Sequence, residues 1–219
     1  MVEDVAEVEH LGEGPPPSPP SPPFGEGPSF PLPPLGPPIS NAPLGMVIFL
    51  GAEGMFFAGL IVAFLAFRLG SPAWPPVGQP RLPIGVTGVN TAILLFSAYP
   101  MVRAWLAIRQ GNRRGLAGGL LLTALLGTTF LGVQGYEWAR LLHFGLTLST
   151  GTYGSTFYTL IGCHGAHVLG AVAWLLIVLI GVTGNRFSAE RHLPVQLCGM
   201  YWFFVVGLWP ILFALVYLN

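Results

Sequence analysis

A carboxylic acid lies inside the first apolar run of this chain that is long enough to cross a bilayer. Glu53 occurs in LGMVIFLGAEGMFFAGLIVAFLAFR, with hydrocarbon-compatible residues on both sides. An ionisable side chain at that depth carries a large transfer penalty unless it finds a partner, a cavity or a proton. Glu53 is therefore the first candidate functional residue, and proton chemistry is the first chemistry to consider.

Two histidines share one helical face in a later apolar run. His164 and His167 lie three residues apart in GTYGSTFYTLIGCHGAHVLGAVAWLLIVL, a spacing that makes side chains neighbours on a helix. Three interpretations follow: a metal or heme site, a proton-relay pair, or histidines that hydrogen-bond to neighbouring helices. A metal would need further ligands, but Glu137, Cys163 and Glu53 supply no recognised ligand spacing. We expect no metal in this chain and favour the structural interpretation, with the relay left open.

The end of the third apolar run combines an amide, an acid and a base. Gln134 and Glu137 are three residues apart in GVQGYEWARLL, and Arg140 follows near the expected interface. Pairing of Glu137 with Arg140 or with another helix is the ordinary explanation, and a proton relay is the alternative. In the second run, Asn90 carries an amide suited to bonding across helices. Asn90 and Gln134 are therefore candidates for helix packing.

The composition says what kind of element must position these side chains. The 219 residues are 53% hydrophobic and only 8% charged, and the mean hydropathy is +0.67. Soluble domains do not reach these values, so we predict an integral membrane protein. Six of the nine acidic residues lie in the first 26 positions, whereas all nine basic residues are arginines that come later. These arginines cluster at the ends of apolar runs, where they meet lipid headgroups, and nucleic-acid binding is not expected.

The chain divides into two regions. Residues 1–43 are rich in proline, as in PPPSPPSPP and PLPPLGPP, and are expected to form a disordered or extended arm. Residues 44–219 hold five continuously apolar runs that could each span about 30 Å of hydrocarbon, which takes roughly 20 helical residues. The expected class is all-α, an integral membrane five-helix bundle. The predicted helices cover residues 44–67, 83–108, 116–139, 153–182 and 194–218.

The arginines also predict the orientation of the bundle. Basic residues beside membrane spans tend to stay in the cytoplasm. An N-terminus inside and a C-terminus outside would place six arginines on the cytoplasmic side and three outside, with the second loop, QGNRRG, contributing most to the difference. The six are Arg103, Arg109, Arg113, Arg114, Arg186 and Arg191.

Five blocks of this sequence resemble subunit III of the heme–copper oxidases, the cytochrome c and quinol oxidase family. Their order and spacing match the family over residues 44–219. The blocks are LGAEGMFFAGL, NTAILLFSAYP, GVQGYEW, YGSTFYTLIGCHGAHVLG and YWFFVVGLWPILFALVY.

The resemblance implies a noncatalytic chain without heme or copper, which partner subunits would carry. It implies packing against subunit I, contact with subunit II and other oxidase subunits, bound phospholipid, and support of proton uptake and turnover stability. Glu53 falls on the family's intramembrane carboxylate, and Trp202 of the last block is expected to pack between helices. Three residues fall in the loop that meets lipid headgroups in relatives: Arg186, Arg191 and His192.

Members of the family often have seven helices, and this chain is similar to the shorter, five-helix form in a bacterial inner membrane. It departs from many relatives in its last helix, where Phe203 and Val206 stand in place of a histidine and an aspartate. Two alternatives therefore stay open: an accessory subunit of a quinol oxidase or nitric oxide reductase-related complex, and a stand-alone proton-coupled transporter. The catalytic subunit is excluded, because its hemes and copper need about six imidazoles and the chain has five histidines.

Overall fold

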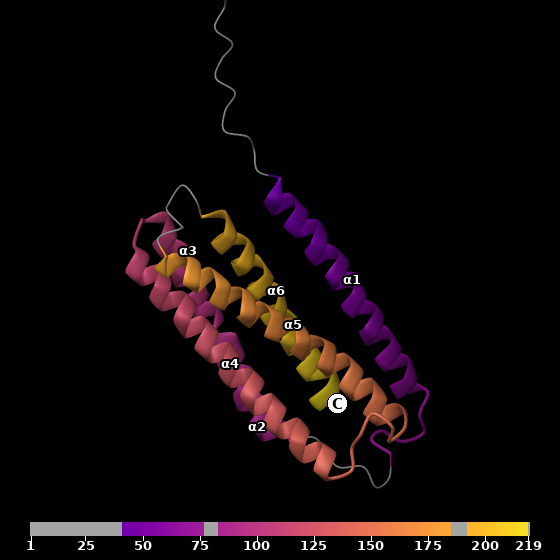
Figure 1. Cartoon of the computed structure of the whole chain (residues 1–219). Coiled ribbons are helices and arrows are strands. Elements are labelled where there is room, and N and C mark those ends of the chain that lie inside the picture. The colour runs from indigo at the N-terminus through magenta and orange to yellow at the C-terminus, as the bar shows by residue number, and fades with distance from the viewer. Residues whose placement is uncertain (1–40, 77–82, 185–191, 219) are drawn as a thin grey trace, which may run out of the picture. The chain divides into compact units, whose positions relative to one another are not determined.

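The computed structural model describes residues 41–76, 83–184 and 192–218, and these are organised as helices (Figure 1). Five helical spans are long and apolar enough to cross a membrane, which confirms the predicted all-α membrane bundle. The second span consists of two helices, α2 and α3. Residues 1–40 of the predicted arm lie outside the described residues. The helices are α1 (Ala42–Leu69), α2 (Ile84–Phe96), α3 (Ala98–Arg109), α4 (Arg113–His143), α5 (Thr152–Thr183) and α6 (Leu193–Tyr217).

The helix ends follow from local sequence. Pro43 occupies the first turn of α1, where its missing N–H costs no hydrogen bond. Between α3 and α4 the chain turns at Gly111, whose φ of 68° is readily adopted by glycine. Asn112 then caps α4, because its side chain accepts a hydrogen bond from the Gly115 N–H at 2.9 Å. A tight connection of this kind makes α3 and α4 antiparallel neighbours.

The second span is interrupted at Ser97, where the sequence predicted one continuous helix. Pro100 has no N–H to offer the carbonyl of Phe96 four residues earlier, so the regular pattern fails there. The Ser97 hydroxyl bonds to the Leu94 carbonyl, and its oxygen accepts the Trp202 indole N–H at 3.2 Å. A hydrogen bond to α6 thus holds the interrupted segment in place.

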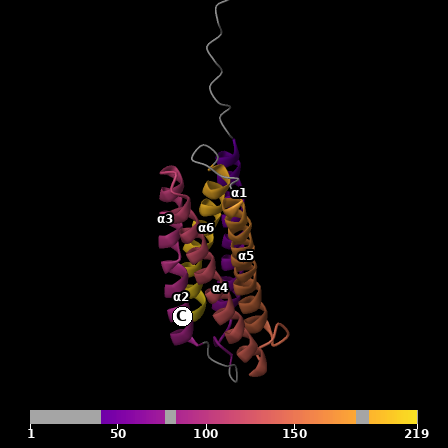
Figure 2. The same cartoon turned by 60° about the vertical axis from the view of Figure 1, so that its left-hand side comes forward.

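Helices α5 and α6 lie in the middle of the helix order across the bundle. These two run between α1 on one side and α2, α3 and α4 on the other (Figures 1 and 2). Among the described elements, α1 contacts α5 and α6, whereas α6 contacts α1, α2, α3 and α5. Only 11% of the apolar window of α1 is buried, against 33–44% in the other spans. The face of α1 that carries Glu53 must therefore find its partners on α5 and α6.

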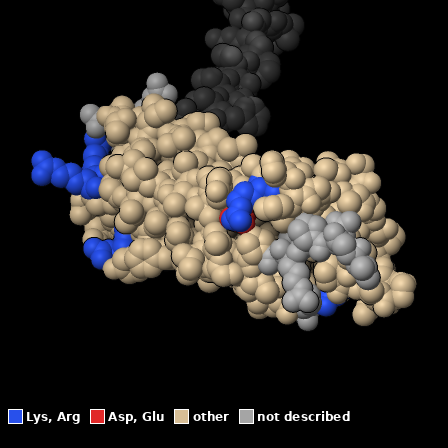
Figure 3. Space-filling model, turned by 90° about the horizontal axis from the view of Figure 1, so that it is seen from below, with Lys and Arg blue, Asp and Glu red and all other residues tan. Residues whose placement is uncertain are grey.

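Most of the face in Figure 3 carries no charged side chains. Basic side chains gather at one end of that face, and one basic group lies beside an acidic one near its middle. Such a surface suits hydrocarbon, with arginines at the edges of the span.

Candidate functional site

The structure brings Glu53 of α1 and His167 of α5 into direct contact. Glu53 Oε2 lies 2.9 Å from His167 Nε2, and the two residues are 114 positions apart in the chain. Their side chains are 22% and 20% exposed, so the pair lies near the surface of the bundle but within two membrane spans. The other ring nitrogen, His167 Nδ1, lies 2.7 Å from the carbonyl oxygen of Cys163.

These two contacts fix how many protons the pair holds. A carbonyl oxygen can only accept, so His167 Nδ1 carries a hydrogen and donates it. The contact between Nε2 and Oε2 then needs one more proton, located on either the imidazole or the carboxyl. Both arrangements are net neutral: imidazolium with carboxylate, or imidazole with carboxylic acid. One proton shared between the imidazole and the carboxyl keeps the pair net neutral, whereas a bare carboxylate within the bilayer is costly.

His164 lies beside this pair in a different environment. Its side chain is fully buried, and neither ring nitrogen has a hydrogen-bond partner among the described residues. The ring stacks on Trp209 with centroids 4.9 Å apart and meets Phe57 edge-on at 6.4 Å. The same Phe57 ring packs against His167 at 5.0 Å. Both histidine rings thus pack against Phe57, but only His167 contacts Glu53.

Glu137 forms a separate polar cluster on α4. Its side chain is buried and pairs with the exposed Arg140 one turn later, at 3.4 Å from Nη1 to Oε1. Gln134, on the same helix, donates to the Tyr217 hydroxyl of α6 at 3.2 Å. No hydrogen bond or ion pair within the described ranges connects Glu137 to Glu53. Of the four predicted proton-related residues, the structure therefore brings together Glu53 and His167, with His164 adjacent and Glu137 elsewhere.

Three indole and amide groups join the helices in the buried interior. Asn90 donates to the Phe130 carbonyl of α4 at 3.1 Å. The Trp209 indole donates to the Thr91 hydroxyl at 2.8 Å, and the Trp202 indole donates to Ser97. Each of these bonds connects α2, or Ser97 directly after it, to a neighbouring span.

Of the predicted lipid-binding residues, Arg186 and Arg191 lie outside the described residues, and His192 is the residue before α6. In the described part of the chain there is no group of three or more histidine, cysteine, aspartate or glutamate side chains that could hold a metal ion.

Sequence reasoning missed three parts of this site: the Cys163 carbonyl, the packing against Phe57 and the Trp209 stack. The Cys163 carbonyl was within reach, because a histidine four residues after a carbonyl on a helix can bond back to it. The aromatic contacts depend on how α1 and α6 lie against α5, and no local spacing reveals that.

The sequence is similar to known proteins over most of its length. A family model described as cytochrome c oxidase subunit III matches residues 40–219. The cytochrome c oxidase subunit 3 of Synechocystis sp. is 39% identical over 175 residues, covering 80% of this chain and 74% of the relative. That of Thermostichus vulcanus is 34% identical over 176 residues, covering 80% and 86%. That of Loxodonta africana is 34% identical over 179 residues, covering 79% and 67%.

Proposed function

The chain belongs to the cytochrome c oxidase subunit III family, and on that premise we propose that it is a noncatalytic subunit that supports proton uptake and turnover stability. Family membership implies a complex with other oxidase subunits. We propose that the chain packs directly on subunit I, with subunit II in the same complex and heme and copper carried by those partners. The complex resides in a bacterial plasma membrane, with the N-terminus of this chain in the cytoplasm.

The observation that carries the proposal is the pair of Glu53 and His167. It holds one proton at a position where a bare carboxylate is unfavourable, and its partial exposure leaves the proton within reach of a neighbouring chain or water. A group that accepts and returns a proton is suited to feeding a proton-consuming partner.

The remaining residues have supporting roles in this proposal. Asn90, Gln134 and Trp202 hold the helices together through buried hydrogen bonds. Glu137 is a structural acid paired with Arg140. Phospholipid headgroups bind near Arg186, Arg191 and His192, where basic residues flank the last span.

The test is Glu53→Gln in the whole oxidase. The glutamine amide can still donate to His167 Nε2, so the contact and the packing persist while the shared proton is lost. We expect normal assembly and heme content, with slower proton uptake in proteoliposomes and faster loss of activity during turnover. Thr129→Val, a change of an exposed side chain on α4, serves as the control and leaves both rates unchanged.

Unchanged proton uptake and unchanged turnover stability in Glu53→Gln would make Glu53 a packing residue and end the proposal. The transporter alternative is tested separately with the isolated subunit in liposomes. Solute-coupled proton movement there would favour the transporter, whereas co-purification with heme-bearing chains supports the oxidase subunit.

A further inference from the structure

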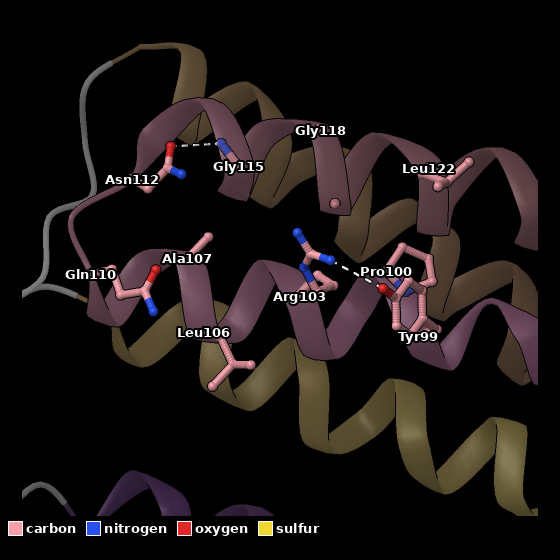
Figure 4. Close-up of a pocket in the computed structure, with 11 residues that line it drawn as sticks. Tyr99, Pro100, Arg103, Leu106, Ala107, Gln110, Asn112, Gly115, Gly118 and Leu122 are labelled. Atoms are coloured by element: carbon pink, nitrogen blue, oxygen red, sulfur yellow. Dashed lines mark hydrogen bonds between the residues drawn. The ribbon is translucent and has the colours of Figure 1, made fainter.

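A groove of about 450 Å³ lies between α3 and α4, away from the Glu53 pair. Figure 4 shows the Arg103 side chain directed into the space between the two helices, below Gly118, with Asn112 toward one end and Tyr99 and Leu122 toward the other. We call this feature the Arg103 groove. Its volume is within the range of sites that bind small ligands.

Arg103 is a cationic residue near the end of a membrane span. It lies six residues before the end of α3, about 9 Å along the helix axis. Its guanidinium donates to the Tyr99 hydroxyl at 3.0 Å, and none of the acidic side chains described in the structure pairs with it. The exposed Arg103 side chain therefore lies close enough to the headgroup region to pair with an anion, and the groove leaves space for one.

The floor of the groove is shaped by glycines. A side chain at Gly119 would collide with the Pro100 carbonyl at 2.7 Å, so α3 and α4 are in close contact there. At Gly118, one residue earlier, a Cβ would meet nothing within 4 Å. The absence of a side chain at Gly118 therefore keeps the groove open without being required for helix packing.

Polarity changes in one direction along the groove. The Gln110 and Asn112 amides lie at the end of the span, Arg103 lies in the middle, and Leu122 lies furthest in. Asn112 uses its oxygen to cap α4, which leaves its NH₂ group as a donor. Leu106 and Leu122 are each 44% exposed, so the groove opens to its surroundings. This order of hydrogen-bond donors, cation and apolar surface matches an amphiphile with an anionic head.

We propose that the Arg103 groove binds one anionic phospholipid. The phosphate lies against the Arg103 guanidinium, the headgroup meets the Gln110 and Asn112 amides, and an acyl chain lies over Gly118 and Leu122. This proposal does not depend on the proton chemistry of Glu53.

The test counts tightly bound phosphatidylglycerol in the whole oxidase. Complexes are extracted from nanodiscs of phosphatidylglycerol and phosphatidylcholine and analysed by native mass spectrometry. We expect Arg103→Gln to weaken retention of one phosphatidylglycerol on the order of fivefold. Gly118→Leu is expected to abolish it, because the leucine fills the path of the acyl chain.

Two matched controls accompany these variants. Arg109→Gln removes the same charge from a residue outside the groove, whose guanidinium lies over the Trp105 ring at 4.2 Å. Gly132→Leu adds the same volume to α4 at a position where a Cβ also meets nothing within 4 Å. Both controls are expected to retain the lipid.

Three results would overturn the proposal. Full retention in both groove variants would show that no lipid depends on the groove. An equal loss in Arg109→Gln would indicate general attraction to basic residues. Crosslinking of a photoreactive residue at Leu106 to another oxidase subunit would show that a protein covers the groove.

Discussion

Two histidines one helical turn apart on α5 have opposite surroundings. His167 uses both ring nitrogens, one toward the Cys163 carbonyl and one toward Glu53. His164 uses neither nitrogen within the described structure, and its ring is held by the stack on Trp209. We therefore propose that the proton chemistry centres on His167 and that His164 is an aromatic packing residue.

Replacement by phenylalanine separates these two roles. His164→Phe keeps the stack on Trp209 and is expected to cost about 1 kcal/mol or less in stability, with normal proton uptake. His167→Phe removes the partner of Glu53 and is expected to slow proton uptake in the assembled oxidase. Thermal unfolding and proton uptake in proteoliposomes measure the two effects. Impaired uptake in His164→Phe would assign His164 to the proton path as well.

The contact between α4, α5 and α6 depends on a missing side chain. A Cβ at Gly127 would lie 2.5 Å from Trp202 and 2.9 Å from Val172. Both neighbours are buried, and Trp202 is also committed to its hydrogen bond with Ser97. Neither can move aside freely, so α4 packs tightly at this point against α5 and against the Trp202 side chain that reaches it from α6.

Gly127→Ala should therefore destabilise the bundle, although alanine is the better helix former. Overpacking of this kind is expected to cost on the order of 1–3 kcal/mol. Gly132→Ala on the same helix meets open space and should be neutral or slightly stabilising. Denaturant titration of the two variants side by side measures the difference. Equal stability of the two variants would show that Trp202 can move.

Among the helices, the sequence predicted the membrane spans but not their internal detail. Apolar length alone indicated five spans, because each run must satisfy its own backbone hydrogen bonds within hydrocarbon. The break at Ser97 was missed, because proline is tolerated within membrane helices and does not always interrupt them. The sequence also placed His164 and His167 on one face but did not distinguish them. Which ring meets Glu53 depends on where α1 lies.

For the whole molecule, the distribution of arginine predicts one orientation. The turn between α3 and α4 is flanked by Arg109, Arg113 and Arg114, whereas the turn between α4 and α5 follows Arg140. These turns lie at opposite ends of a 31-residue helix, about 46 Å apart. They must therefore face opposite sides of the membrane, and the larger positive charge predicts that the first turn faces the cytoplasm.

Cysteine labelling of intact cells tests this orientation. Ser149→Cys, in the turn between α4 and α5, should react with a membrane-impermeant thiol reagent. Gln110→Cys should react only after the membrane is permeabilised. The native Cys163 and Cys198 lie within α5 and α6. The labelling of the wild-type chain therefore measures the background signal. Labelling of Gln110→Cys alone in intact cells would reverse the assignment.

The separation of Glu53 from His167 along the chain has a consequence for biogenesis. Ribosomes make the N-terminal span first, and the 114 residues between the two take on the order of ten seconds to translate. During that interval His167 has not been made, and the neutral acid is the form of Glu53 that enters lipid at the lower cost. On the proposed function we therefore expect Glu53 to enter the membrane protonated and to share that proton with His167 once α5 is in place.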